Sequence, residues 1–461
     1  LLDGAPIPFL FHFGTVTSTF QSRLLSGVDL YPGNFSVRYG RASGGIVEAR
    51  SRDARSDRWH ALLDVAVLDS TAMVEGPVDS RTSLALAARR SNIDLYLDAV
   101  LPSGDYAVVA APMYWDYQAL FTRRLEGEGK LKVVVFGSHD QAYFSMKDPA
   151  GGDPLLRGTL GGETEHHQIM LSHEGQLGAR VSELSSVTLA YQTLSQRVGP
   201  ELHADVGFFI GTLRSEAKAA LSDSVDLTVG LDTQLENIDG SYVGSRPPQL
   251  EGNPDIGQAD SLQEQLAFNA NETQIRPALY VELPWRPTAS WLVLPGLRSD
   301  LWLDLGRVTV DPRLMVRHEL GAGLALKGGV GLFTQAPLYY QTMRYIGNPE
   351  LELPQALQIS VGAEKTFGER LFLSSELFAK TMRKLVVTTA DGTAPYMEND
   401  GSGRALGLEL LAKSRPWWGA TMQLAYTLSR SERRLHDSGW RLFDSDQTHN
   451  LAFVAGQDLG K

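Results

Sequence analysis

In the stretch GATMQLAYTLS, residues 419–429, larger apolar side chains alternate with small or polar ones. One face would carry Ala420, Met422, Leu424, Tyr426 and Leu428, and the other Thr421, Gln423, Ala425, Thr427 and Ser429. A period of two is that of a β-strand with one apolar and one polar face. The polar face is small and hydroxylic, so the stretch predicts a strand whose two faces meet different surroundings.

The same alternation recurs from about residue 57 onward. In residues 403–413, for example, Leu406 and Leu408 alternate with Gly407 and Glu409. We count about 18 such strands between residues 57 and 459. A soluble sandwich shows the same pattern, so periodicity alone leaves both a sandwich and a membrane barrel open.

Composition narrows the classes of protein. The chain has 461 residues, of which 43% are apolar and 21% charged, and it has no cysteine. The absence of cysteine excludes disulfides, thiolate metal sites and cysteine nucleophiles. A net charge of -12 argues against a nucleic-acid partner. The longest apolar run, residues 106–115, is about half the length of a spanning helix, whereas a barrel strand needs only about 9–11 residues.

The connections between the predicted strands favour the barrel. Short turns lie at residues 75–80, 126–130, 175–180, 222–224, 320–323, 367–370 and 414–419. Long polar or Pro/Gly-rich segments lie near residues 91–111, 140–162, 239–272, 334–353, 388–402 and 432–446. Because the two kinds largely alternate, an up-and-down meander would place the turns at one end and the loops at the other. That asymmetry is typical of an outer-membrane barrel.

Residues 1–52 differ from the rest. Residues 15–27 carry Phe20 and Leu24 at helical spacing and end in Gly27, which predicts a short helix. Short strands are expected at residues 28–33 and 44–50. The segment holds five arginines against three acidic residues, so it is slightly basic in an acidic chain. We expect a small α/β unit within the polar lumen of the barrel.

The run LLDGAPI (1–7), followed by LLSGVDLYPGNFSVRYGRASGGIVEARSR (24–52), resembles the second half of the plug domain of TonB-dependent outer-membrane receptors. The structural motif of the resembled plug falls on Asp3, Gly4, Pro6, Gly33, Tyr39, Gly40, Gly44 and Gly45. Barrel segments VDPRL (310–314), GVGLFTQAP (329–337) and NDGSGRALGLEL (399–410) resemble the same family. The glycines of the motif are expected to serve turns or close packing of the backbone.

The resemblance implies a mainly β fold, a transmembrane antiparallel up-and-down barrel with part of a small α/β plug in its lumen. Barrels of this family have about 22 strands, so the domains expected are a C-terminal plug half, residues 1–52, and a barrel, residues 53–461, truncated at its C-terminal end. The N-terminal plug half and the box that engages TonB are absent from the sequence.

The resemblance also implies the function. We expect a monomeric receptor in the outer membrane of a Gram-negative bacterium, with outer-membrane lipid, TonB and a small solute as partners. Energised uptake of a scarce siderophore, vitamin, carbohydrate or peptide needs no cofactor. The alternative is a structural or adhesive barrel without active transport. A membrane-barrel hydrolase would need a Ser/His/carboxylate set, and the sequence offers no catalytic or metal-binding motif.

Plug arginines of the resembled family meet glutamates of the barrel wall. Here Arg41 and Arg50 are expected to face Glu409, which the alternation places on the polar face. The alternative is that each charge is separately solvated.

Two aromatic groups are candidates for solute binding. Phe9, Phe11, His12 and Phe13 follow the predicted plug strand and would lie near the floor of an outer vestibule. Tyr339, Tyr340, Arg344 and Tyr345 lie in a predicted outer loop, where aromatic and guanidinium groups suit ligand capture. The alternatives are that the phenylalanines pack the plug onto the wall and that the loop packs on itself.

Overall fold

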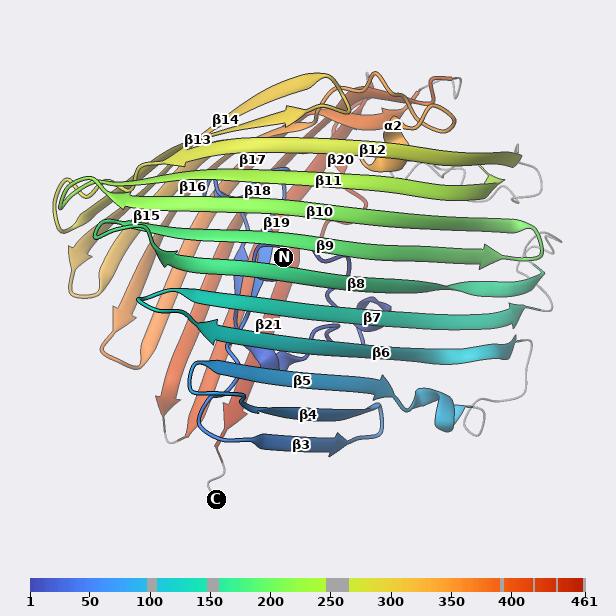
Figure 1. Cartoon of the computed structure of the whole chain (residues 1–461). Coiled ribbons are helices and arrows are strands. Elements are labelled where there is room, and N and C mark those ends of the chain that lie inside the picture. The colour runs from blue at the N-terminus through green and yellow to red at the C-terminus, as the bar shows by residue number, and fades with distance from the viewer. Residues whose placement is uncertain are drawn as a thin grey trace.

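The computed structural model describes residues 1–97, 106–146, 157–245, 265–389, 394–417, 419–436 and 438–458. Long strands make up most of the chain (Figure 1). They are β3 (His60–Val65), β4 (Asp69–Pro77), β5 (Thr82–Ser91), β6 (Tyr106–Arg124), β7 (Lys130–Met146), β8 (Gly158–Gln176), β9 (Val181–Val198), β10 (Leu202–Ala220), β11 (Asp226–Ser245), β12 (Gln265–Glu282), β13 (Trp291–Trp302), β14 (Arg307–Gly321), β15 (Leu324–Thr334), β16 (Gln355–Phe367), β17 (Leu371–Thr388), β18 (Met397–Trp417), β19 (Ala420–Leu435), β20 (Arg441–Leu442) and β21 (His449–Gln457).

These strands form a barrel of up-and-down topology, which confirms the predicted fold class. The strand order is that of a closed barrel, and neighbours in sequence pair antiparallel from β3–β4 round to β19–β21. The short β20 and β21 both pair with β19 and share one position. The described strands thus fill 18 positions, in agreement with the number expected from alternation.

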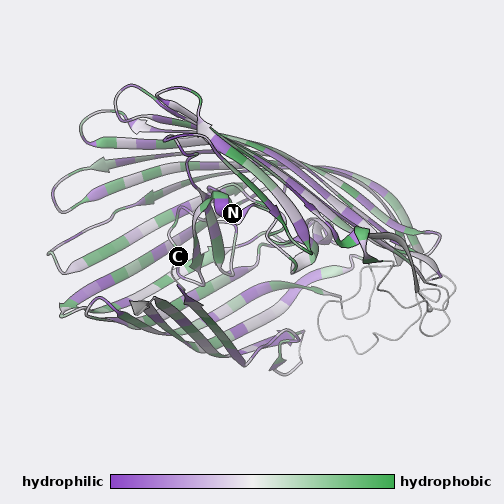
Figure 2. Cartoon of the chain, turned by 90° about the horizontal axis from the view of Figure 1, so that it is seen from below, coloured by the Kyte–Doolittle hydropathy of each residue, from purple (hydrophilic) through white to green (hydrophobic). Residues whose placement is uncertain are grey.

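The two faces of each strand meet different surroundings, as the alternation predicts. On β9, Thr188 and Ala190 are buried, whereas Val187, Leu189 and Tyr191 are exposed apolar side chains on the opposite face. The same parity holds on neighbouring strands, and Figure 2 shows the resulting bands of alternating hydropathy. The buried face points into the lumen, so the exposed apolar side chains form an outer belt.

Short and long connections alternate along the barrel. The predicted turns all join consecutive strands at one end, which is called here the short-turn end. The opposite, long-loop end carries the predicted long segments, although parts of those near 91–111, 140–162, 239–272, 388–402 and 432–446 lie outside the described residues. Three described connections at the long-loop end, residues 66–68, 199–201 and 303–306, are tight and were not predicted.

Strand length varies around the wall. Strands β8 to β12 have 18–20 residues each, whereas β13 to β16 have 11–15. The longer strands reach well beyond the shorter ones at the long-loop end (Figure 1).

Residues 1–52, called here the luminal segment, lie inside the barrel (Figures 1 and 2). Its strands β1 (Leu25–Tyr31) and β2 (Ile46–Ser51) pair antiparallel at the two predicted places. The predicted helix over residues 15–27 is wrong: a single 3-10 turn, η2 (Ser22–Leu24), leads directly into β1. Two apolar side chains give too short a face for a helix, and Thr19 instead donates its backbone N–H to the Leu10 carbonyl and its hydroxyl to the Phe9 carbonyl.

Among the elements that the described residues define in full, the remaining helical ones are η1 (His12–Gly14), η3 (Ile93–Leu95) and α2 (Tyr339–Thr342). Among the described residues, no helix has the length and apolar character to cross a membrane.

Two apolar clusters join the luminal segment to the wall. Leu2, Phe20 and Leu24 pack against inward side chains of β5 to β8, including Phe136 and Met170. Farther round, Phe35, Tyr39 and Ile46 pack against β15 to β17 through Phe333, Ala356 and Met382. Burial of this apolar surface stabilises the docked segment.

Candidate functional site

A cavity at the long-loop end opens on the inner face of β9 to β12. Its volume is about 180 Å³ and its lining is mostly apolar. The wall contributes Gln196, Val206, Ile238, Tyr242 and Phe268, and the segment around α2 contributes Tyr339, Tyr340, Met343 and Ile346. We call this cavity the vestibule pocket.

Of the predicted loop aromatics, Tyr339 and Tyr340 line this pocket, and Tyr339 and Tyr345 pack on wall aromatics. Tyr339 meets Phe208 edge to face at 5.4 Å between ring centroids, and Tyr340 lies 5.8 Å from Tyr339. Tyr345 stacks on Phe268 at 5.3 Å. Arg344 is exposed. Tyr339 and Tyr340 therefore both pack within the loop and line the pocket, whereas Tyr345 only packs on the wall.

The aromatic residues predicted at positions 9–13 divide into two groups. Phe9 and Phe11 are 39% and 46% exposed, and Phe13 is half-buried with its ring edge toward Tyr114. His12 is completely buried. It is therefore not a ligand-facing side chain, which corrects the prediction for this residue, because its ring is enclosed by the barrel wall.

The wall around His12 is strongly polar. Its Nδ1 lies 2.8 Å from Asp140 and its Nε2 3.1 Å from Asp116, and the ring stacks on Tyr114 at 4.3 Å. Arg89 donates to Asp116 at 2.7 Å and to the Thr17 hydroxyl. Because carboxylates only accept, both ring nitrogens of His12 must donate, which requires the imidazolium. Burial opposes this charge, but the hydrogen bonds that His12 donates to Asp116 and Asp140 outweigh it and raise the pKa of His12.

Asp3 and Gly4 of the plug motif form a turn against the wall. Both have positive φ, +49° and +84°. Asp3 accepts from the Ser51 backbone at 2.9 Å and lies 3.7 Å from the Lys132 ammonium. Arg214 of β10 donates to the Gly4 carbonyl at 3.0 Å. The turn thus joins the start of the segment both to β2 and to the barrel.

Among the remaining motif residues, the glycines mainly allow the backbone to approach neighbouring atoms closely, and fewer of them serve turns. A Cβ on Gly40 would lie 1.9 Å from Nε of Arg298, and one on Gly45 would lie 2.8 Å from the Tyr31 carbonyl. Gly33 approaches Gln358, whereas Gly44 has open space around it. Tyr39 donates to Glu48 across the luminal segment, and Pro6 is half-buried.

The predicted ion pairs with Glu409 are not formed. Arg41 lies 2.5 Å from Asp232 on β11 and 3.8 Å from Asp300 on β13, and Arg50 pairs at 2.8 Å with Asp29 on the adjacent β1. Glu409 instead lines a separate cavity beside Gly33 and Gly44, on the other side of the lumen. The correction has a simple cause: the alternation gives the face of a residue but not its position around the barrel.

Wall cations that we did not predict hold the backbone of the luminal segment. Arg313 donates to the carbonyls of Ser36 and Tyr39 at 2.8 and 2.7 Å, and Arg298 reaches Val37 at 3.5 Å. Arg298 is fully buried between Asp232 and Asp300, at 2.8 and 2.7 Å. The available signal was the charge in RSD (298–300) and VDPR (310–313) on inward positions of long strands.

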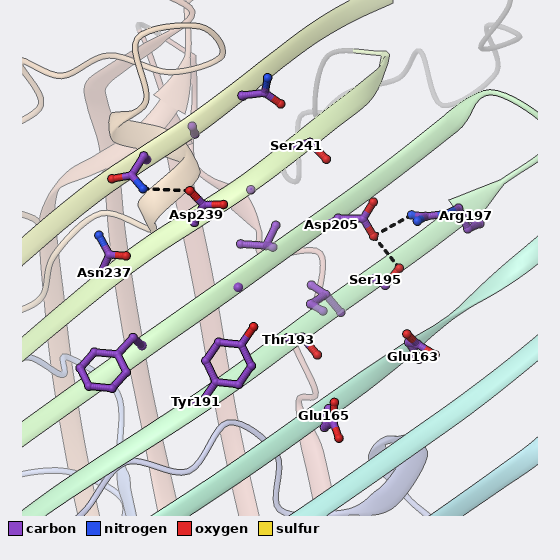
Figure 3. Close-up of a pocket in the computed structure, with 18 residues that line it drawn as sticks. Glu163, Glu165, Tyr191, Thr193, Ser195, Arg197, Asp205, Asn237, Asp239 and Ser241 are labelled. Carbon is purple, nitrogen blue, oxygen red and sulfur yellow. Dashed lines mark hydrogen bonds and ion pairs between the residues drawn. The ribbon is translucent and has the colours of Figure 1, made fainter.

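A larger, polar cavity lies on the opposite face of the same wall. Its volume is about 890 Å³, and its labelled side chains, shown in Figure 3, include Glu163, Glu165, Thr193, Arg197, Asp205 and Asp239. They share the parity of the exposed Ile169, Leu189 and Phe209, so they belong to the outside of the barrel. This cavity is therefore no part of the luminal site.

Among the described residues, no group of three or more His, Cys, Asp or Glu side chains is placed to hold a metal ion. The chemistry of the luminal site is that of aromatic contact and of hydrogen bonds between wall and segment.

Comparisons with known proteins agree with this architecture. The model of the family described as TonB dependent receptor-like, beta-barrel matches residues 116–459. No curated protein matches the sequence. The siderophore receptor PirA from Acinetobacter baumannii is similar in structure, with a TM-score of 0.73 at 14% identity over 100% of this chain and 76% of that one.

Two further structures show the same fold. A mutant of the ferric enterobactin receptor PfeA from Pseudomonas aeruginosa gives a TM-score of 0.68 at 15% identity, covering 95% of this chain and 76% of that one. The FrpB iron transporter from Neisseria meningitidis gives 0.66 at 14% identity, covering 92% and 71%. The chain belongs to the TonB-dependent receptors, a family of outer-membrane receptors and transporters.

Proposed function

We propose that the protein takes up a scarce small solute across the outer membrane with energy delivered by TonB. The observation that supports this most directly is the position of the luminal segment, which lies below an aromatic vestibule pocket and is held to the wall by many separate hydrogen bonds and ion pairs. Such contacts hold a plug in place and can be exchanged for water when it is pulled.

In this proposal residues 1–52 act as plug and residues 53–461 as barrel, in the outer membrane of a Gram-negative bacterium. The outer belt contacts lipid, and the barrel works as a monomer. The solute binds between Phe9, Phe11 and Phe13 on the plug and Tyr339, Tyr340, Arg344 and Tyr345 above it. TonB then displaces the plug, and no covalent chemistry is involved.

The solute class follows from the lining. Planar aromatic rings with few charges in the vestibule pocket suit a solute that offers apolar or aromatic surface. A mutant of the structural neighbour PfeA has been solved with enterobactin, and PirA is described as a siderophore receptor. We propose a siderophore as the first class to test, before vitamins, carbohydrates and peptides.

The test is growth of a strain that lacks the full-length receptor across single iron and carbon sources. We expect a defect on one source, the same defect when TonB alone is deleted, and a weaker binding of that solute by the Tyr339→Ala receptor. A normal growth pattern in both deletion strains would instead support the structural or adhesive barrel.

A further inference from the structure

The luminal segment is fastened to two sectors of the wall and much less to the sector between them. On one side the apolar cluster joins it to β5 to β8. On the other, Asp232, Arg298, Arg313 and Gln358 bond to it from β11 to β16. Within the described part of β9 and β10, the hydrogen bonds and ion pairs to the segment come from Arg214 and Glu216.

A cavity lies at the short-turn end of this weakly fastened sector and extends to the neighbouring strands β7 and β8. It has a volume of about 340 Å³ and lies between the luminal segment and the inner face of β7 to β10. Ser172, Ser186, Arg214 and Glu216 line it from the wall, and Asp3, Arg38 and Glu48 from the segment. Its polar, charged surface is one that a hydrated solute can cross.

Above this cavity, the inner face of β8 and β9 carries buried polar groups that lack partners. His166, Gln168 and Thr188 are each at most 3% exposed, and within the described structure their side-chain nitrogen and oxygen atoms have no hydrogen-bond partner. Buried polar groups in native proteins are nearly always paired with protein or with water. These side chains therefore offer hydrogen-bond donors and acceptors to a molecule that enters between the luminal segment and the inner face of β8 and β9.

The vestibule pocket continues the same strip to the long-loop end, because Gln196 and Val206 line it from β9 and β10. We infer that the solute passes along the inner face of β8 to β10, from the vestibule pocket past Thr188 to the lower cavity. This inference rests on the proposed function. The opposite wall, where Glu409 lines a cavity of about 240 Å³ with Ala405, is not the route.

Arg214 closes the lower end of this strip. Its guanidinium donates to the carbonyls of Gly4 and Arg38 at 3.0 and 2.9 Å. Glu216 lies 3.5 Å from Nε of Arg38 and accepts from Tyr280 at 2.9 Å. Withdrawal of residues 4 and 38 from the wall breaks these contacts and opens the strip into the lower cavity.

The absence of cysteine from the chain gives a clean test. Single substitutions Ser186→Cys and Ser172→Cys place a thiol in the lower cavity, and the matched control Ala405→Cys places one in the opposite cavity. Intact cells that express the full-length receptor are treated from outside with a fluorescent maleimide too large for general porins. Labelling is compared between strains with and without TonB, and surface levels are checked with an antibody.

We expect TonB to speed labelling of the cysteines at 172 and 186 several-fold and to leave that at 405 unchanged. A TonB-dependent rise at 405 alone, or at all three positions, would overturn the one-sided route while leaving energised transport in place. If no position responds to TonB although each variant reaches the surface, both the route and the proposed function are wrong.

Discussion

His12 shows how a single residue can couple the apex of the luminal segment to pH. Its imidazolium is held by Asp116 and Asp140, beside Arg89 and Tyr114. Because the folded pKa of His12 is raised above 6.5, the stabilisation is complete below the unfolded value and is lost as pH rises through the folded one.

We therefore predict that hydrogen exchange of the backbone around residues 9–20 speeds up as pH rises through this range, after correction for the intrinsic pH dependence of exchange. The His12→Gln variant is the control, since an amide does not titrate there, and its corrected exchange should be constant. A wild-type profile as flat as that of the variant would show that His12 is not the titrating group.

On the other side of the lumen, we expect the loss of Arg298 to lower the free energy of unfolding strongly. Arg298 is fully buried, and its removal takes away the positive charge that is paired with the carboxylates of Asp300 and Asp232. Breaking a buried pair from one side costs about 3–5 kcal/mol, whereas replacing both partners by apolar residues is close to neutral.

We thus predict that Arg298→Leu lowers the free energy of unfolding by several kcal/mol and that Arg298→Leu with Asp300→Leu regains part of it. Denaturant unfolding in detergent measures both. Additive losses in the double variant would mean that the two side chains act independently.

At the scale of the element, the strands carry two different outer surfaces along their length. On β9, Leu189 lies in the apolar outer belt, whereas Thr193, four residues farther along the same face, lines the polar outer cavity. We therefore expect Thr193 to lie outside the hydrocarbon core of the membrane.

We predict that Leu189→Arg costs roughly 2–4 kcal/mol and Thr193→Arg roughly 0–1 kcal/mol, as expected for arginine at the middle and the edge of a bilayer. Unfolding from lipid vesicles gives both values in matched samples. Equal costs at the two positions would place the membrane boundary elsewhere on β9.

Elements were more predictable from the sequence than contacts. Alternation located the strands and their faces, because burial in a barrel depends on parity alone. It could not say which inward residue meets which part of the luminal segment, so Arg41 was matched to Glu409 when it meets Asp232. The aromatic residues around Tyr339 were found as a group, but their wall partners Phe208 and Phe268 come from strands far away in sequence.

At the scale of the whole molecule, the segment in the lumen should act as a stopper. In the full-length receptor, we predict that deletion of residues 1–52 leaves the barrel in the membrane but raises the entry of a large antibiotic, because the segment occupies the lumen between two sectors of the wall. Antibiotic susceptibility at matched receptor levels measures this. Unchanged susceptibility would mean that other parts of the receptor seal the pore.

The unequal strand lengths have a consequence for how a solute arrives. At about 3.3 Å per residue and a tilt of about 40°, strands of 18–20 residues rise about 45–50 Å, well beyond an apolar belt about 25 Å tall. Strands β13 to β16 are much shorter and lie between β12 and the 18-residue β17, so the rim dips over this sector of the wall. The mouth of the receptor is therefore open sideways over this low sector, and capture there is expected to favour solutes that diffuse within the surface glycan layer over those that descend from above it.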